Sequence, residues 1–237
     1  MTGRIHSFQS LGTVDGPGVR AVVFTQGCPL RCICCHNPDT WDASGGEEIE
    51  CDTLFRKIER CRAYFGRNGG VTVSGGEPLL QSAFVRELFE KCHQAGIHTA
   101  LDTSGCLLND DVRALLDVTD LVLLDHKYAT EEDYRAYTGG SLLSTGRFLE
   151  ELEARKLPTW FRRVIIPGRT DRIGEIRALN DIARAHRCVE KIELLPFRSF
   201  CLEKYEALSI PFPLKDTPSP SRETMEALNA ALDPCYR

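Results

Sequence analysis

The chain has 237 residues, of which 42% are hydrophobic and 27% are charged, and 29 Lys and Arg residues against 34 Asp and Glu residues give a net charge of −5. These values exclude a disordered chain, a collagen-like repeat and a polybasic tail, so no nucleic-acid partner is predicted. The unusual feature is the 11 cysteines, an odd number that does not suit a disulfide framework.

Predicted strands and helices alternate along the chain. Six short apolar, β-branched runs predict strands at Val19–Thr25, Val71–Val73, Ile97–Thr103, Asp120–Asp125, Thr159–Ile166 and Glu190–Phe197. Apolar residues at helical spacing predict helices at Asp52–Tyr64, Leu80–Ala95, Asp110–Leu116, Thr145–Glu153, Ile173–Ala185 and Arg222–Leu232. The repeated order of strand then helix indicates an α/β fold with a parallel sheet. Six such units are too few for a complete eight-stranded barrel.

No low-complexity linker or internal repeat divides the chain. We therefore expect a single domain over residues 1–237, with an N-terminal lead at 1–18 and a C-terminal loop and helix at 199–237. The N-terminus lacks the apolar core of an export signal, and the longest apolar runs are far shorter than the roughly 20 residues that span a membrane. These features predict a cytoplasmic protein without membrane contact, whose thiols stay reduced.

Polar or glycine-rich residues occur at or just after the end of every predicted strand. The segments are C-P-L-R-C-I-C-C-H-N, S-G-G-E-P, D-T-S-G, D-H-K, R-R-V-I-I-P-G and L-P-F-R. In α/β folds the active site lies at the carboxyl ends of parallel strands. We therefore expect these segments to converge on one site.

Three cysteines form a C-x3-C-x2-C motif directly after the first predicted strand, namely Cys28, Cys32 and Cys35. Three thiolates on one turn can hold a metal centre and leave one metal position open, as a catalytic site requires. Cys34 could supply a fourth ligand, and the motif would then be a structural metal site or an electron-transfer centre. The remaining seven cysteines, at positions 51, 61, 92, 106, 188, 201 and 235, show no ligand spacing and are predicted to be core or surface thiols.

Carboxylates follow three of the other strands. The two glycines of S-G-G-E-P would let the backbone approach a ligand closely, and Glu77 adds a carboxylate, although a plain strand-to-helix turn is the alternative. Asp102 and Asp125 end neighbouring strands, so they require a counter-cation, either Lys127 or a bound ion. The alternative for this pair is a helix cap and an ordinary salt bridge.

The cysteine motif followed by G-G-E resembles the radical S-adenosylmethionine (SAM) superfamily. Further segments resemble the glycyl-radical-enzyme activases, in particular those that act on pyruvate formate-lyase: G-T-V-D-G-P-G-V-R, T-Q-G-C-P-L-R-C, C-H-N-P-D-T-W-D, V-T-V-S-G-G-E-P-L-L-Q, G-I-H-T-A-L-D-T-S-G and E-K-I-E-L-L-P-F. The resemblance extends over nearly the whole chain and implies a partial (βα)6 TIM-like barrel of radical SAM type. Residues 40–72 hold only two cysteines, so the ferredoxin-like insertion of many other activases is absent.

The resemblance implies an enzyme that reductively cleaves SAM at a [4Fe–4S] cluster and abstracts a hydrogen from a backbone glycine of a pyruvate formate-lyase-like partner. The catalytic cluster ligands would be Cys28, Cys32 and Cys35. The implied cofactor-binding residues are Cys34, Cys35, His36, Gly75, Gly76, Glu77, Asp125, His126, Lys127, Arg163 and Arg198. The S-G-G-E-P segment would hold the amino group of SAM, and the Glu77 carboxylate would balance its charge. A monovalent cation, Na⁺ or K⁺, would lie at Asp102, Thr103 and Asp125.

Three positions depart from the family pattern. Cys34 stands where an aromatic residue usually lines the adenine, His126 where an apolar residue is usual, and Arg198 where the nearest relatives have a histidine. We expect these departures to affect SAM binding more than cluster binding. The resemblance also implies a flavodoxin or ferredoxin reductant, and we expect a monomer. The alternatives are an activase of a different glycyl radical enzyme and a non-catalytic iron–sulfur electron-transfer protein.

Overall fold

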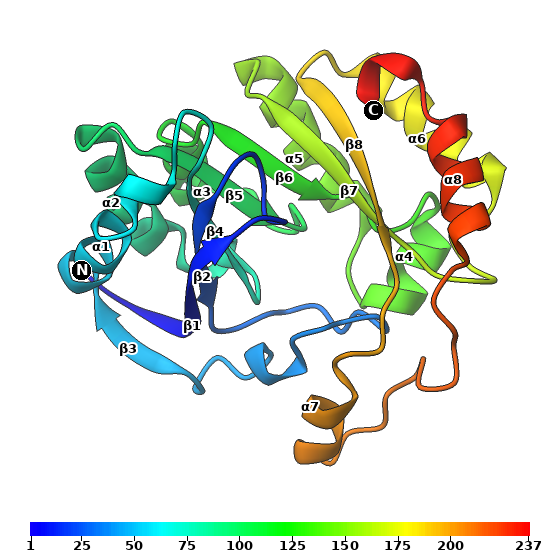
Figure 1. The fold of residues 1–237 in the computed structure, drawn as a ribbon, viewed down its shortest axis with the longest axis horizontal. Coiled ribbons are helices and arrows are strands. Elements are labelled where there is room, and N and C mark those ends of the chain that lie inside the picture. The colour runs from blue at the N-terminus through cyan, green and yellow to red at the C-terminus, as the bar shows by residue number, and fades with distance from the viewer. The chain divides into compact units, whose positions relative to one another are not determined.

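The computed structural model describes all residues from Met1 to Arg237 (Figure 1). The chain divides into two compact units, each made of two segments. The first unit contains residues 1–29 and 40–123, and the second contains residues 30–39 and 124–237. Strand β6 (Leu121–Asp125) begins in the first unit and ends in the second. That the whole chain forms one domain stays a prediction.

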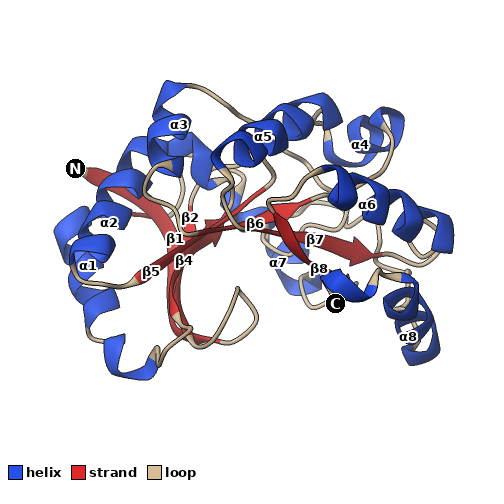
Figure 2. Cartoon of the chain, turned by 90° about the horizontal axis from the view of Figure 1, so that it is seen from above, coloured by secondary structure: helices blue, strands red, loops and turns tan.

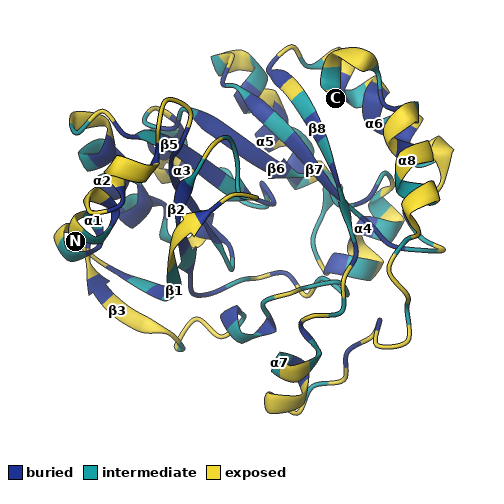
Figure 3. Cartoon of the chain, viewed as in Figure 1, coloured by how far each residue is buried: buried dark blue, intermediate teal, exposed yellow.

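The first unit is built on a sheet with the strand order β3-β1-β2-β4-β5-β6. The bounds are β1 Thr2–Gly12, β2 Arg20–Thr25, β3 Glu47–Glu50, β4 Gly70–Gly75 and β5 His98–Thr103. β1 pairs antiparallel with both β2 and β3, whereas β2, β4 and β5 are parallel. The parallel strands are buried along almost their whole length, as their continuous apolar sequences predict (Figure 3).

Three α-helices follow strands of this unit. They are α1 Cys51–Glu59, α2 Ser82–Gln94 and α3 Asp110–Leu116, and α2 contacts both of the others (Figure 2). Short 3₁₀ turns lie at Pro38–Thr40, Arg62–Tyr64 and Pro78–Gln81. α2 buries Phe84, Leu88 and Phe89 at helical spacing, so one face of the helix joins the core.

A buried arginine joins the beginnings of the three parallel strands. Arg20 is fully buried at the start of β2, and its guanidinium donates to Thr72 Oγ1 and the Val71 carbonyl, each at 2.6 Å, and to the His98 carbonyl at 3.3 Å. Burial lowers the pKa of Arg20 to about 10. This dense hydrogen bonding satisfies a group that would otherwise be costly in the core.

The second unit contains the end of β6 and the strands β7 (Thr159–Ile165) and β8 (Val189–Pro196), in the order β6-β7-β8. β7 and β8 are parallel. The helices are α4 Glu131–Thr138, α5 Leu142–Arg155, α6 Ile173–Ala185, α7 Leu202–Ala207 and α8 Arg222–Ala231, and a last 3₁₀ turn covers Pro234–Tyr236. No helix of the chain has both the length and the apolar character needed to cross a membrane.

All six predicted strands and all six predicted helices are present, and the α/β prediction is confirmed. Four elements were not predicted, namely β1, β3, α4 and α7. The expected N-terminal lead at 1–18 contains β1. The burial of this strand is irregular, and bulges interrupt its pairing with β2. Its polar and apolar residues therefore do not follow the pattern of a buried strand. α4 is short and mostly polar, so its apolar periodicity is weak.

Candidate functional site

In the first unit, the G-G-E loop follows β4 and packs against the residues that lead into the cysteine motif. Gly76 N–H donates to the Thr25 carbonyl at 2.9 Å, and Glu77 N–H donates to the Gly27 carbonyl at 2.8 Å. A Cβ atom at Gly75 would lie 2.3 Å from Thr25 N, and one at Gly76 would lie 2.2 Å from the Gly27 oxygen. The two glycines are therefore required because the two loops approach each other backbone to backbone.

The Glu77 carboxylate is the anchor of this loop. Its side chain is buried, and its oxygens accept hydrogen bonds from Thr103 Oγ1, Ser104 N–H, Ser104 Oγ and Leu79 N–H. Four donors from two loops compensate the cost of burying the charge. Glu77 therefore fixes the turn after β5 against the turn after β4.

Asp102 and Thr103 end β5 beside that anchor. Ser74 Oγ donates to Asp102 Oδ2 at 2.6 Å, while the Thr103 hydroxyl donates to Glu77. Asp102 is only partly buried, so its carboxylate remains close to solvent at the end of the strand. Of the two carboxylates Glu77 and Asp102, that of Asp102 is therefore the one more accessible to a cationic group.

In the second unit, the end of helix α4 holds the cysteine loop at residues 30–39. The last carbonyl groups of a helix lack partners within the helix. Here the Thr138 carbonyl accepts from Arg31 N–H at 2.7 Å, and the Tyr137 carbonyl accepts from Ile33 N–H at 3.0 Å. The loop thus completes the hydrogen bonding of α4, and the helix end fixes the backbone on both sides of Cys32.

Residues at and near α7 hold the other end of the same loop. The Tyr205 hydroxyl donates to the Cys35 carbonyl at 3.2 Å, and His36 Nε2 donates to the Arg198 carbonyl at 2.8 Å. Lys204 Nζ contacts Asn37 Oδ1 at 2.9 Å and Asp39 Oδ2 at 3.0 Å. The cysteine loop is therefore bonded to α4 at one end and to the α7 segment at the other.

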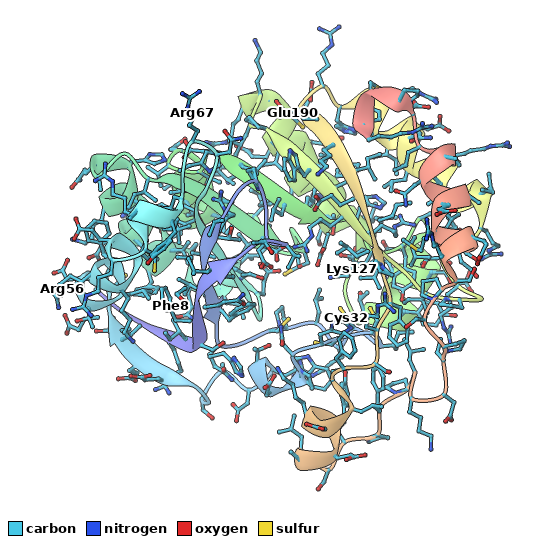
Figure 4. All side chains as sticks on the ribbon, in the orientation of Figure 1. Phe8, Cys32, Arg56, Arg67, Lys127 and Glu190 are labelled. Atoms are coloured by element: carbon cyan, nitrogen blue, oxygen red, sulfur yellow. The ribbon has the colours of Figure 1, made fainter.

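The thiols of this loop lie beside a lysine. Burial raises the pKa of Cys32 to about 11, and Lys127 is the charge that opposes this rise. Burial also raises the pKa of the neighbouring Cys34 to about 12. Figure 4 labels Cys32 and Lys127, which both belong to the second unit. These thiols therefore keep their protons until a metal displaces them.

Lys127 forms an ion pair with Asp125 directly after β6. The Nζ–Oδ2 distance is 2.6 Å. Burial lowers the pKa of Lys127, but Asp125 and Cys32 outweigh this effect and the pKa lies well above its usual range. The lysine is therefore a fixed cation, able to attract both thiolates and a ligand carboxylate.

His126 and Arg163 form a separate buried cluster. Arg163 donates from Nε to the His126 carbonyl at 2.6 Å and from Nη2 to His126 Nδ1 at 2.9 Å, and it pairs with Glu175 at 3.3 Å. Neighbouring side chains at the end of a strand point to opposite faces, so His126 does not lie with Asp125 and Lys127. Its ring instead lines a cavity of about 360 Å³ with residues of α5 and α6, including Leu149.

The predicted residues are thus distributed over both units. Cys28 and the residues from Gly75 to Thr103 belong to the first unit, whereas Cys32, Cys34 and Cys35 belong to the second. Also in the second unit are the remaining predicted positions His36, Asp125, His126, Lys127, Arg163 and Arg198. Arg198 is exposed, and its contact with His36 is made by its backbone. The Arg163 guanidinium donates to His126 and pairs with Glu175.

Sequence reasoning placed Ser74 and Ser104 in the S-G-G-E-P and D-T-S-G segments without finding their contacts, and it missed Lys204 and Tyr205 altogether. Each acts through a contact with a residue far away in the sequence, and a short motif gives no sign of it. Helix α4 did carry a signal. Thr130 caps its first turn by accepting from Asp133 N–H, and Gly139 ends it in the left-handed conformation.

The second unit offers a suitable environment for an iron–sulfur cluster. All 11 cysteines are free of disulfides, including the three of the motif. Lys127 supplies positive charge beside Cys32, and the buried hydroxyl of Tyr128 has no hydrogen-bond partner in the protein. Free thiols, a nearby cation and an unused donor suit an anionic sulfur cluster.

Comparison with known proteins gives three findings. Residues 14–153 match the family model described as "4Fe-4S single cluster domain". The chain is 44% identical over 231 residues to the pyruvate formate-lyase-activating enzyme of Clostridium pasteurianum, covering 97% of both chains. It is 42% identical over 234 residues to the pyruvate formate-lyase 1-activating enzyme of Escherichia coli K12, covering 98% of this chain and 95% of that protein.

A solved structure shares the fold. Streptococcus suis SuiB bound to S-adenosylmethionine matches with a TM-score of 0.66 at 12% identity, over 86% of this chain and 44% of SuiB. At this identity the match concerns the fold alone. It agrees with the α/β architecture predicted from the sequence.

Proposed function

The chain belongs to the family of pyruvate formate-lyase-activating enzymes, and we propose that it is a radical SAM activase whose protein substrate is a pyruvate formate-lyase. The observation that carries this proposal is the cysteine loop at residues 30–39. Its thiols Cys32 and Cys35 are free of disulfides, its backbone is fixed at both ends, and Lys127 lies beside Cys32.

When bound, the [4Fe–4S] cluster and SAM supply the redox chemistry, which is one-electron cleavage of SAM followed by removal of a hydrogen atom from the partner's glycine. We propose that the thiolates of Cys28, Cys32 and Cys35 bind the cluster. Each thiol must lose its proton to bind iron, and Lys127 favours the thiolate at Cys32 against the effect of burial.

For SAM, the chain provides groups that match an amino acid's two charges. Lys127 suits the carboxylate, and the partly buried carboxylate of Asp102 suits the ammonium group. Glu77 contributes by holding the end of β5, which carries Asp102, because its own oxygens are occupied by Thr103, Ser104 and Leu79. These roles follow from charge and from the hydrogen bonds within each unit.

The remaining predicted positions have supporting or open roles. Arg163 would act by holding the backbone at His126, since its guanidinium bonds to that carbonyl. Contacts of SAM with Cys34, His36, Asp125 and Arg198 stay predictions of the family resemblance. The same holds for a monovalent cation at Asp102, Thr103 and Asp125, which anaerobic SAM-binding measurements in Na⁺, K⁺ and cation-free buffers would test.

We further propose that a flavodoxin or ferredoxin is the electron donor. We also propose that the chain is a monomer, and light scattering would test this. A cytoplasmic location is proposed because none of the 11 cysteines forms a disulfide, as expected in a reducing compartment.

The proposed function is tested by anaerobic reconstitution with iron and sulfide, reduction, and addition of SAM. We expect 5′-deoxyadenosine from the wild-type protein and none above background from Cys35→Ala. Cys61→Ala is the matched control, because Cys61 is a free cysteine outside the motif. With pyruvate formate-lyase added, electron paramagnetic resonance should detect a glycyl radical.

Other results would favour the alternatives. A cluster that reduces and reoxidises without consuming SAM would indicate an electron-transfer protein. A radical formed only on a different glycyl radical enzyme would contradict the assigned partner while leaving the SAM chemistry intact.

A further inference from the structure

Tyr128 carries a buried hydroxyl group that the protein does not use. The residue is 4% exposed, and its Oη has no hydrogen-bond partner. A buried hydroxyl without a partner costs free energy, so native proteins rarely keep one unless a water, ion or ligand satisfies it. Tyr128 comes directly after Lys127, which already belongs to the site through its ion pair with Asp125.

The surroundings of Tyr128 are the cysteine loop and the end of α4. Its ring packs against Tyr137 with 5.1 Å between the ring centroids, and the Tyr137 carbonyl holds Ile33 N–H of the loop. Arg169 covers the Tyr137 ring at 4.5 Å. The aromatic pair is therefore fixed on the helix end that also fixes the backbone around Cys32.

The hydroxyl is available at this position as a neutral hydrogen-bond donor. Burial, reinforced by the neighbouring thiols of Cys34 and Cys32, raises the pKa of Tyr128 above its usual range. The hydroxyl keeps its proton at physiological pH and can donate it in a hydrogen bond to an acceptor. One of the two thiols that influence its pKa is Cys32, a proposed cluster ligand.

We propose that the Tyr128 hydroxyl donates a hydrogen bond to a sulfur atom of the bound [4Fe–4S] cluster, either a sulfide or a cysteine thiolate, and so positions and tunes that cluster. The inference rests on the proposed function, because it requires the cluster. Hydrogen bonds to cluster sulfurs stabilise the more negative, reduced state and raise the reduction potential. Tyr128 would thus make the cluster easier to reduce.

The test compares wild type, Tyr128→Phe and Tyr137→Phe after anaerobic reconstitution. Tyr137→Phe is the matched control, because it removes a hydroxyl from the same ring pair without removing the unpartnered one. Iron and sulfide content, the midpoint potential from an EPR-monitored titration, and pulsed EPR of the reduced cluster in D₂O are measured for each. Thermal unfolding of the cluster-free proteins verifies that both variants fold.

We expect a shift of the midpoint potential to more negative values in Tyr128→Phe, with no shift in Tyr137→Phe. We also expect an exchangeable deuteron coupled to the cluster in wild type and in Tyr137→Phe that is lost in Tyr128→Phe. Equal potentials and unchanged deuteron coupling in all three proteins would overturn the inference. Failure of the wild-type protein to bind a cluster would instead contradict the proposed function.

Discussion

The buried pair of His126 and Arg163 makes a quantitative prediction about stability and pH. Arg163 can only donate, so His126 Nδ1 must be the acceptor and the imidazole must be neutral in the folded protein. Burial and the charge of Arg163 lower the pKa of His126 to about 3, whereas an unfolded histidine titrates near 6.5. The unfolded state therefore binds a proton that the folded state excludes.

This difference in pKa sets the direction in which stability changes with pH. Because the pKa is lower in the folded state, the stability contributed by neutral His126 is present above pH 6.5 and is lost as the pH falls from 6.5 toward 3. When the pH falls from 7.5 to 5.5, protonation of this residue in the unfolded state lowers the free energy of unfolding by about 1.4 kcal/mol.

The assay is urea unfolding of the cluster-free protein at pH 7.5 and 5.5, for wild type and for His126→Leu. The other histidines are common to both proteins, so they cancel when the two pH dependences are subtracted. Wild type should lose about 1.4 kcal/mol more than His126→Leu over this range. The same pH dependence in both proteins would refute the assignment of His126 as a neutral, buried acceptor.

Three further predictions concern Glu77 and Gly76 of the first unit and Lys127 of the second unit. Glu77→Gln places an amide N–H opposite at least one of the buried donors that now bond to the carboxylate, and it should lower the free energy of unfolding by about 3 kcal/mol. The control Glu226→Gln changes an exposed side chain and should alter the free energy of unfolding by less than about 0.5 kcal/mol. Equal effects of the two substitutions in denaturant titrations would contradict the role of Glu77 as an anchor. Lys127→Met should raise the pKa of Cys32 above about 11, so mass spectrometry should find slower alkylation of that thiol at pH 9. An unchanged rate would be inconsistent with an effect of the Lys127 charge on Cys32. Gly76→Ala forces a Cβ to within 2.2 Å of a carbonyl oxygen and should destabilise the protein by about 2 kcal/mol; a normal unfolding midpoint would mean that the loops do not approach this closely.

Much of the fold was predictable because its central strands are nearly continuous apolar runs. Buried strands such as β4 and β6 have this pattern, and glycine or carboxylate residues mark their ends. β1 was not predictable in the same way, since its polar residues and bulges reflect antiparallel pairing near the edge of the sheet. Helix α4 was missed for lack of apolar periodicity, although Thr130 and Gly139 mark its two ends.

For the site, the sequence indicated which segments matter but not what each side chain does. Glu77 was expected to face an ammonium group, yet its carboxylate is occupied by donors from the next strand's turn, 26 and 27 residues later. His126 and Lys127 are adjacent in the sequence but point to different surroundings, because side chains alternate at the strand end. Long-range hydrogen bonds and side-chain direction decided these roles, and a short motif encodes neither.

The central claim is that this chain activates a pyruvate formate-lyase by radical SAM chemistry. The most direct measurement is EPR of a pyruvate formate-lyase after anaerobic incubation with the reconstituted chain, SAM and reduced flavodoxin. The account predicts a glycyl radical signal that requires SAM and is absent when Cys35→Ala replaces the wild-type chain. A cluster-loaded wild-type protein that cleaves no SAM and produces no such radical would contradict it.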